Sequence, residues 1–162
     1  LVSLALVSTT LVVSASPQGP SLPEQFYGKF RLHHFENFDE YLEAKGYSWY
    51  TRKLVGTSVF EKVFLKNMDN SFDYVNFTTK KNVAYWEIRL GRAFHGEGLD
   101  SRPHNITFFM QNGKLYEKHI PLDENGEAKN EVYEYCFEGG FLIVRMEANG
   151  VVAKRFYKRV NE

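Results

Sequence analysis

The alternation of apolar and polar positions predicts short antiparallel strands along most of the chain. In the first of them, between Phe26 and His34, Phe30 and Leu32 alternate with charged or imidazole side chains. After Gly56, further strands are separated by turn dipeptides, the later of which recur every 10 to 14 residues. These dipeptides are Asp69-Asn70, Asn112-Gly113, Asn125-Gly126, Gly139-Gly140 and Asn149-Gly150. Because Asn-Gly and Gly-Gly suit two-residue hairpins, this spacing predicts an up-and-down meander.

One helical region, over residues 37 to 56, interrupts the strands. Asn37 is placed to cap a first helix and Glu40 to reach back to it, while Gly46 is placed to end it. Ser48 is placed to cap a second short helix, so the two would form an αα-hairpin. The first helix carries its periodic side chains at Phe38, Tyr41, Leu42 and Lys45. A strand, a helix pair and a long meander together predict a closed barrel, because closure removes the exposed edge strands.

The N-terminal stretch has the composition of a targeting segment. Residues 1–15 are apolar or hydroxylated and end in Val13-Ser14-Ala15, which favours a signal peptide cleaved after Ala15. This stretch has no basic region and does not begin with Met, so we expect it to be truncated. A transmembrane anchor is the alternative, although about 20 apolar residues are needed to span a bilayer.

The remaining chain divides into a leader and a folded domain. The proline-rich residues 16–25 are expected to be a leader that is unstructured as far as Pro23, and residues 26–162 are expected to form one domain. Secretion would make two sequons candidates for glycosylation, at Asn76 and Asn105. Both sequons are also compatible with ordinary strand composition, because threonine is common in strands.

Composition narrows the classes of function. Twenty basic and 20 acidic residues balance, which argues against a nucleic-acid partner held by bulk charge. Aromatic residues make up 16% of the chain, enough either to fill a core or to wall an apolar cavity. The single cysteine, Cys136, cannot build a disulfide framework and is expected to be an inert thiol.

Neither a metal site nor a catalytic constellation is predicted. The five histidines lack ligand spacing, and the adjacent His33 and His34 should point to opposite faces of a strand. No nucleophile elbow, phosphate loop or carboxylate pair for acid–base chemistry is evident, so we expect no cofactor and no enzyme activity.

The last strand carries the candidate binding residues. Lys154 and Lys158 mark one face as solvated, so Arg155 and Tyr157 should point inward. An arginine inside an apolar barrel needs an anion or ordered water to offset its desolvation, and a carboxylate fits its fork-shaped guanidinium. The alternative is that the alternation is reversed and the arginine lies on the surface.

Several segments resemble the intracellular lipid-binding family, which contains the fatty-acid-binding and cellular retinoid-binding proteins. They are Gly28-Lys29-Phe30-Arg31-Leu32, Asn37-Phe38-Asp39-Glu40-Tyr41-Leu42, residues 45–53, residues 90–94 and Arg155-Phe156-Tyr157. The resemblance runs from Phe26 to Val160 and implies an all-β fold, a ten-stranded antiparallel up-and-down barrel (β-clam) capped by a helix-turn-helix lid. It also implies that Arg155 and Tyr157 are the family's carboxylate-binding pair. The leader resembles that of the secreted nematode branch.

The family's second cavity arginine has no counterpart here. Its place falls near Glu134 or Tyr135, which leaves Tyr135 as a candidate hydrogen-bond donor, and Arg145 does not align with it. Phe38 and Leu42 are candidates for the inner face of the lid. Trp86, Ile88 and Leu90 are placed inward by strand alternation, although ordinary core packing explains all of these apolar residues equally well.

These observations predict a carrier of long-chain fatty acids or similar apolar carboxylates in an extracellular fluid. We expect a monomer with a small-lipid partner and transient membrane contact. A tail of about 14 methylenes contributes roughly 11 kcal/mol before association costs, so the tail would dominate affinity and Arg155 would orient it. The alternatives are a carrier specific for a retinoid and an extracellular interaction protein whose barrel is filled.

Overall fold

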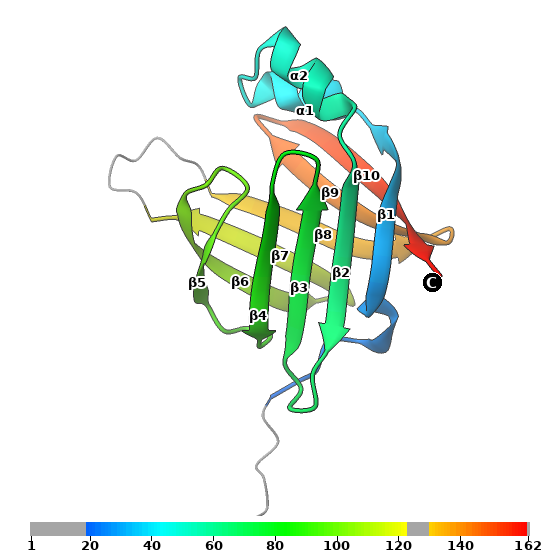
Figure 1. Cartoon of the computed structure of the whole chain (residues 1–162), viewed down its shortest axis with the longest axis vertical. Helices are drawn as coiled ribbons and strands as arrows, with labels where there is room; N and C mark the ends of the chain where they lie inside the picture. The colour runs from blue at the N-terminus through cyan, green and yellow to red at the C-terminus, as the bar shows by residue number, and fades with distance from the viewer. Residues whose placement is uncertain (1–18, 123–129, 162) are drawn as a thin grey trace, which may run out of the picture.

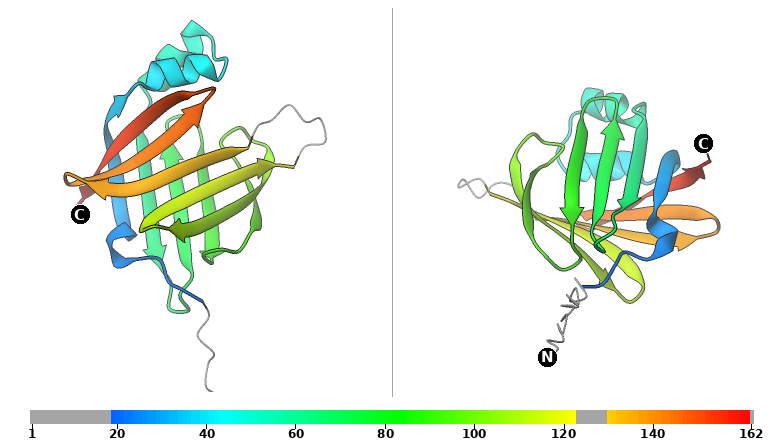
Figure 2. Two further views of the ribbon diagram at one scale, coloured as in Figure 1. Left: turned by 180° about the vertical axis from the view of Figure 1, so that it is seen from behind. Right: turned by 60° about the horizontal axis from the view of Figure 1, so that its bottom comes forward.

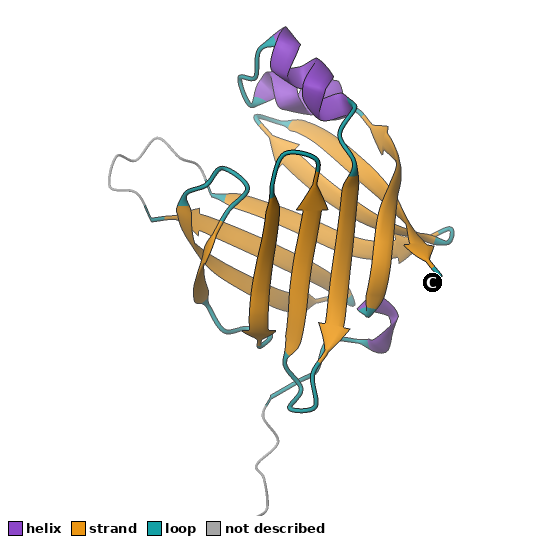
Figure 3. Ribbon diagram, in the orientation of Figure 1, coloured by secondary structure: helices purple, strands orange, loops and turns teal. Residues whose placement is uncertain are grey.

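Ten antiparallel strands curl into a nearly closed barrel, with two helices over one end (Figures 1 and 3). This computed structural model describes residues 19–122 and 130–161. The helical elements are η1 (Glu24–Phe26), α1 (Phe38–Ala44) and α2 (Trp49–Gly56). The strands are β1 (Gly28–Glu36), β2 (Phe60–Lys66), β3 (Phe72–Thr78), β4 (Asn82–Ile88), β5 (Phe94–Glu97), β6 (Pro103–Gln111), β7 (Lys114–Pro121), β8 (Glu131–Glu138), β9 (Phe141–Ala148) and β10 (Val151–Val160). The predicted fold is confirmed.

The order of the strands shows how the barrel closes. The sheet runs β4-β3-β2-β1-β10-β9-β8-β7-β6-β5, so most neighbours in the sheet are also neighbours in the chain. The exception is the pairing of β1 with β10, which joins the first strand to the last. β4 and β5 are the two edges of the sheet formed by the described residues, and they leave a seam in the wall. Figure 2 shows the barrel from behind and from below.

The predicted hairpin turns have the expected backbone geometry. Asn112-Gly113, Gly139-Gly140 and Asn149-Gly150 all have positive φ angles at both positions, as two-residue hairpins of this type require. Asn125-Gly126 lies outside the described residues. The turn residues therefore predict three hairpins correctly, those that join β6 to β7, β8 to β9 and β9 to β10.

The two helices form the lid and are fixed at their ends by different contacts. The Ser48 side chain accepts a hydrogen bond from the Thr51 backbone N–H at 3.3 Å, which confirms the predicted cap of α2. The predicted cap at Asn37 is wrong. Asn37 adopts a left-handed conformation (φ 57°), and its amide donates to the Val152 carbonyl of β10 at 2.9 Å. Asn37 therefore ties the lid to the barrel instead of capping α1.

The end of the barrel opposite the lid is closed by residues that precede β1 (Figure 1). Leu22 and Phe26 are at most 1% exposed and belong to the main hydrophobic core. The Phe26 ring packs edge-on against Phe137 at a centroid distance of 5.0 Å. The expectation that the leader is unstructured up to Pro23 is therefore wrong at Leu22. Residues 1–15, the expected signal peptide, lie outside the described residues.

A bulge in β4 corrects one predicted orientation. Glu87 has a φ of 53°, and the pairing with β3 shifts between Phe72–Ile88 and Tyr74–Tyr85. Tyr85 and Ile88 consequently both point inward, while the Trp86 side chain is 63% exposed. The prediction that Trp86 faces the cavity is wrong, because simple alternation does not hold across a bulge.

A second bulge lies in β1 and corrects the placement of two histidines. The pairing of β1 with β10 shifts between Leu32 and His34. His33 and His34 therefore lie together, with their Nδ1 atoms 2.7 Å apart on an exposed surface. The expectation that they point to opposite faces is wrong, because the bulge interrupts the alternation of the strand.

Candidate ligand-binding site inside the barrel

The last strand, β10, points its candidate binding residues into the barrel as predicted. Arg155 is 7% exposed and Tyr157 is fully buried, whereas Lys158 is exposed. The Arg155 guanidinium lies 5.8 Å from the ring centroid of Phe38 in the lid and 5.2 Å from that of Phe60 in β2. These rings cover the cation without supplying a counter-charge.

Two polar atoms of this pair have no protein partner. Arg155 Nε and Tyr157 Oη are buried and make no hydrogen bond to the described residues. Burial raises the pKa of Tyr157, although the charge of Arg155 opposes it, so the phenol keeps its proton and remains a donor. A buried donor without an acceptor costs about 1–3 kcal/mol. An anionic ligand would remove that cost, so we call Arg155 and Tyr157 the anchor.

A second buried cation, Lys62, escaped the sequence analysis. Lys62 in β2 is 2% exposed, and its Nζ donates to Tyr74 Oη at 2.7 Å. Its ammonium also lies 5.5 Å from the ring of Tyr135 and 5.8 Å from that of Tyr157. Burial, and then the charge of Arg155, lower the pKa of Lys62 to about 7. The sequence feature that could have revealed Lys62 is its position between Phe60 and Phe64 on one face of the same strand.

The position at which the family's second arginine was sought holds no cation. Tyr135 occupies the inward position at which that arginine was sought, and it is fully buried. Its hydroxyl donates to Glu117 and lies 3.3 Å from Tyr74 Oη, so its proton is already committed. Arg145 lies on the surface and pairs with Glu147 at 3.0 Å. The second positive charge of the interior therefore comes from Lys62 of β2 and not from β8, the strand of Tyr135.

Glu117 links the interior tyrosines to a pair of buried histidines. Glu117 in β7 is 4% exposed and accepts from His119 Nε2 at 2.6 Å. His119 contacts His104 of β6 through their Nδ1 atoms at 2.9 Å, and His104 Nε2 lies 3.0 Å from Asp100. Burial alone would raise the pKa of Glu117, but the hydrogen bond and charge of His119 hold it below its ordinary value.

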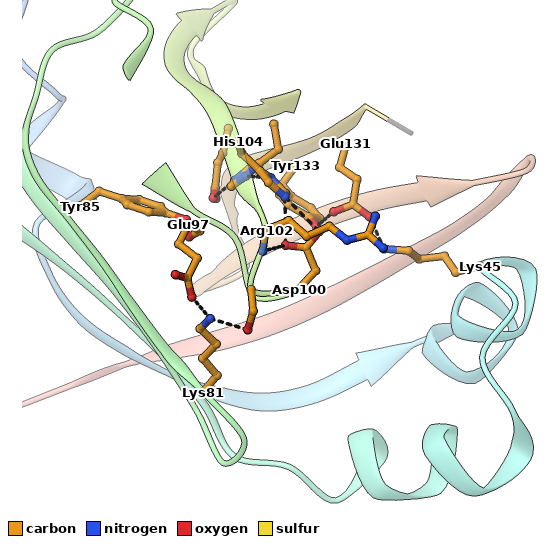
Figure 4. A network of polar contacts seen from close by, with 12 residues as sticks. Lys45, Lys81, Tyr85, Glu97, Asp100, Arg102, His104, Glu131 and Tyr133 are labelled. Carbon is orange, nitrogen blue, oxygen red and sulfur yellow. Dashed lines mark hydrogen bonds and ion pairs between the residues drawn. The ribbon is translucent and has the colours of Figure 1, made fainter. Parts of the chain in front are cut away.

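The polar contacts drawn in Figure 4 lie toward the end of the barrel that carries the lid, and we call this end the mouth. Lys45, which follows α1, pairs with Glu131 at the start of β8, and Tyr133 also donates to Glu131. Lys81, in the turn between β3 and β4, pairs with Glu97 of β5. The ion pairs therefore connect the rim of the barrel to the lid and across the seam.

The lid and wall residues follow the predictions apart from Trp86. Phe38 and Leu42 are 7% and 6% exposed, and Ile88 is 1% exposed. All three belong to the main hydrophobic core, and Leu90 packs against it. The lid thus presents Phe38 to the interior beside Arg155.

Comparison with known proteins identifies the family. No family model matches the chain. The chain is 54% identical to fatty acid-binding protein homolog 1 of Caenorhabditis elegans over 157 residues, 96% of this chain and 98% of that protein. It is 37% identical to the fatty acid-binding protein homolog of Ascaris suum over 160 residues, 96% of this chain and 97% of that protein. The chain belongs to the fatty-acid-binding protein family.

The structural comparison agrees with this assignment. As-p18, an extracellular fatty acid binding protein, is 38% identical and superposes with a TM-score of 0.80, covering 86% of this chain and 99% of that one. Membership of the fatty-acid-binding protein family supports lipid binding in the barrel. The anchor on β10 lies inside the barrel of this family member.

The seam between β4 and β5 holds an open cavity of about 500 Å³. Its lining includes Lys81, Tyr85, Trp86, Phe94 and Glu97. In this family member Trp86 thus faces the seam from outside, and Tyr85 from within. The cavity is partly polar and open to solvent, whereas the anchor is buried.

The two sequons differ in accessibility. Asn76 in β3 is 4% exposed and faces the interior beside Lys62, its partner in the β2–β3 pairing. A glycan has no room there, so Asn76 is a poor candidate. Asn105 in β6 is half-buried on the alternate face of its strand and stays a candidate.

The remaining reactive groups do not form a metal site. No group of three or more histidine, cysteine or carboxylate side chains suited to a metal ion occurs among residues 19–122 and 130–161. Cys136 is half-buried, and burial raises the pKa of its thiol. A raised pKa disfavours the thiolate, in agreement with the expectation of an inert thiol.

Proposed function

We propose that this protein binds and carries long-chain fatty acids, or similar apolar carboxylates, in an extracellular fluid. The observation that carries the proposal is the anchor, whose donors Arg155 Nε and Tyr157 Oη are buried and have no partner in the part of the chain that the structure describes. A ligand carboxylate accepts from both, and the nearby ammonium of Lys62 adds positive charge. The fatty-acid-binding relatives support this class of ligand.

The expected division of binding energy follows from the surfaces involved. Burying about 14 methylenes contributes roughly 11 kcal/mol before association costs, whereas one hydrogen bond to a charged group contributes about 1.5–3 kcal/mol. The aromatic interior would therefore supply most of the affinity. The anchor would fix the direction in which the ligand lies.

The test is a titration of a fluorescent fatty acid into the purified, delipidated protein. We expect saturable binding at one site and displacement by oleate. Arg155→Ala should weaken binding about 10- to 100-fold, corresponding to the loss of a charged hydrogen bond. Arg145→Ala is the matched control, because Arg145 lies on the outer surface, and it should bind as the unaltered protein does.

Other outcomes of this titration distinguish the alternatives. Displacement by retinoic acid but not by oleate would point to a retinoid carrier. A folded protein that binds neither ligand at micromolar concentration would contradict carriage and favour a filled barrel with a partner on its outer surface.

The extracellular setting is proposed from the apolar N-terminal stretch and from the description of As-p18 as extracellular. Expression with its leader in a secretory eukaryotic host should deliver the protein to the medium. We expect a glycan, if one is added, at Asn105 and none at Asn76, which mass spectrometry after glycosidase treatment would locate. Retention of a folded protein inside the cell would contradict secretion.

Ligand exchange by transient membrane contact is proposed for the monomer. Helix α2 of the lid exposes Trp49, Tyr50 and Leu54, each more than half accessible to solvent. Such side chains partition into membrane interfaces. Transfer of the fluorescent fatty acid to vesicles should accelerate with vesicle concentration, and a transfer rate independent of vesicles would contradict contact.

A further inference from the structure

His104 and His119 form a buried pair inside the barrel, which we call the histidine pair. Each is 5% exposed, and the rings meet edge to face with centroids 5.1 Å apart. The Nδ1 atoms are 2.9 Å apart, within hydrogen-bond distance. The Nε2 atoms point away from each other, one toward Asp100 at 3.0 Å and the other toward Glu117 at 2.6 Å.

These contacts limit how hydrogen bonds can be arranged around the histidine pair. The pKa of Asp100 lies below its ordinary value despite burial, because the Arg102 backbone and His104 donate to it; Glu117 is held ionised by His119 in the same way. An Nε2 atom facing an ionised carboxylate must carry a proton. A hydrogen bond between two Nδ1 atoms needs a proton on one of them only. With both carboxylates ionised, three N–H groups satisfy all of these contacts, one on each Nε2 and one between the two Nδ1 atoms.

A second excess proton does not fit this arrangement. It would place two N–H groups head to head at 2.9 Å and two positive charges side by side, so the rings would have to separate. Histidine is the side chain whose charge ordinarily changes between pH 5 and 8. The geometry thus contains a bond that exists only while one proton is shared.

The groups that surround the histidine pair come from five elements. Tyr85 of β4 and Tyr133 of β8 face His119, with ring centroids 6.4 and 6.0 Å away. Tyr85 donates to the Glu97 carbonyl, and burial raises its pKa, so it adds no charge. The charged neighbours beyond the direct contacts are Glu97, Arg102, Glu131 and Lys62. Within residues 19–122 and 130–161, the groups outside the pair that contact the imidazole nitrogens directly are Asp100 and Glu117.

One side of the histidine pair holds the mouth of the barrel. Asp100 belongs to the turn between β5 and β6, next to Arg102 and near Glu131, which binds Lys45 of the lid (Figure 4). Gly98 in the same turn lies so close to His104 that a Cβ atom there would be 2.6 Å from the ring. The His104 ring therefore packs directly against this turn.

The other side leads to the ligand. Tyr135 donates to Glu117, Lys62 donates to Tyr74, and Tyr74 is left to donate to Tyr135. All the hydrogen bonds from Lys62 to Glu117 thus run in one direction. They connect the histidine pair to the ammonium beside the anchor.

We propose that the histidine pair is a proton-operated latch that releases the ligand in acid. Uptake of a second proton separates the rings, frees the Asp100 turn at the mouth and opens a path for the ligand beneath the lid. This inference rests on the proposed function, because it concerns the release of a fatty acid. It adds a device by which the carrier holds its ligand at neutral pH and delivers it to an acidic site.

The test measures the dissociation rate of a fluorescent fatty acid by stopped flow, with excess oleate, from pH 7.5 to pH 5. We expect the rate to rise about tenfold or more in the unaltered protein. In His104→Asn only one imidazole of the pair remains, so a proton on His119 no longer opposes another. The rate of this variant should change less than twofold across the range.

A matched control is available on the outer surface. His33 and His34 form a second Nδ1–Nδ1 contact, at 2.7 Å, with no part in the mouth. His33→Asn should therefore keep the full acid acceleration. Acceleration retained in His104→Asn, or absent in the unaltered protein, would overturn the latch. Absence of saturable binding at pH 7.5 would instead overturn the proposed function.

A second measurement does not depend on the variant or on the ligand. Nitrogen-15 spectra of the histidine side chains in the ligand-free protein should show one shared Nδ1 proton at pH 7.5, and loss of that bond on acidification. Amide exchange in residues 98 to 103 should accelerate over the same pH range. An intact Nδ1–Nδ1 bond at pH 5 would contradict the proposal even if His104→Asn failed to fold.

Discussion

Two buried polar clusters lie inside this barrel, and they differ in how their polar atoms are satisfied. Around the anchor, Arg155 Nε and Tyr157 Oη lack partners, and the nearby Lys62 adds a second positive charge. Around the histidine pair, every nitrogen has a partner, and each Nε2 atom faces a carboxylate. Burying polar groups is costly in both cases. The anchor leaves part of that cost for a ligand to relieve, whereas the histidine pair relieves it internally.

Because of this difference, we expect the anchor to affect mainly ligand binding and the histidine pair to affect mainly the stability of the empty protein. A cluster with unpaired donors lowers the stability of the empty protein and gains from an anion. A cluster with complete pairing is damaged by the loss of any member, because the remaining partner is left buried and alone. Substitutions should therefore have opposite effects on stability in the two places.

The largest effect is expected at Glu117, which joins the two clusters. Glu117→Leu removes the acceptor of both His119 and Tyr135, so the free energy of unfolding should fall by about 3–5 kcal/mol. Urea denaturation at pH 7.5 measures this loss. Glu134→Leu is the control, since Glu134 pairs with Lys114 near the surface and should cost about 1 kcal/mol or less. Equal losses in the two variants would show that the interior pairing has no special role.

The next effect is a pH dependence that comes from Lys62. Its pKa is about 7 in the folded protein and near 10.5 in the unfolded chain, so between these values the unfolded chain binds more protons. Stability of the empty protein should therefore rise from pH 7 to pH 10, by up to about 1.4 kcal/mol per unit. Below pH 7 both states are protonated and Lys62 adds no further change.

Two variants of that experiment sharpen the comparison. Lys62→Met should remove the rise in stability, and a bound fatty acid should reduce it, because the carboxylate favours the charged lysine. Urea denaturation at several pH values gives the slopes. A slope that is the same with and without Lys62 would mean that the lysine is charged and solvated in the empty barrel.

A smaller effect with opposite signs is expected at Arg155. Arg155→Met should stabilise the empty protein by about 1 kcal/mol, because it removes a buried charge without a partner. The same substitution should weaken fatty acid binding, since it removes the anion's donor. Thermal unfolding with and without oleate measures both. A loss of stability in the empty protein would indicate that Arg155 has a structural partner, and would remove the contrast with Glu117.

The smallest effect is expected on the outer wall. Trp86→Ala should change the free energy of unfolding by about 0.5 kcal/mol or less and leave fatty acid affinity unaltered, because Trp86 is largely exposed. This variant gives a baseline for the other three. A large loss of affinity would show that the seam between β4 and β5 takes part in binding.

Sequence reasoning succeeded where periodicity and turn chemistry act locally. The three Asn-Gly and Gly-Gly hairpins, the Ser48 cap and the inward orientation of Arg155 and Tyr157 all follow from neighbouring residues. The errors in side-chain orientation fall at the bulges in β1 and β4, where one extra residue reverses the alternation. A bulge depends on pairing with another strand, and no short sequence pattern here announced it.

The interior polar residues show a different limit. Lys62 shares the apolar face of its strand with Phe60 and Phe64, so its inward position could have been predicted. Its hydrogen bond to Tyr74 could not, because that bond joins two strands. The histidine pair joins β6 to β7, and its two members are separated by 15 residues. Spacing alone does not reveal which inward side chains meet across a barrel.

The pairing of β1 with β10 has a consequence for biosynthesis. A ribosome releases the chain from its N-terminus, so β1 must wait for the final strand before its second edge is covered. That same strand carries Arg155 and Tyr157, so no partly made chain possesses the anchor. If Arg155 and Tyr157 bind the ligand as proposed, a nascent chain gains its complete binding site only when β10 pairs with β1 and finishes the barrel.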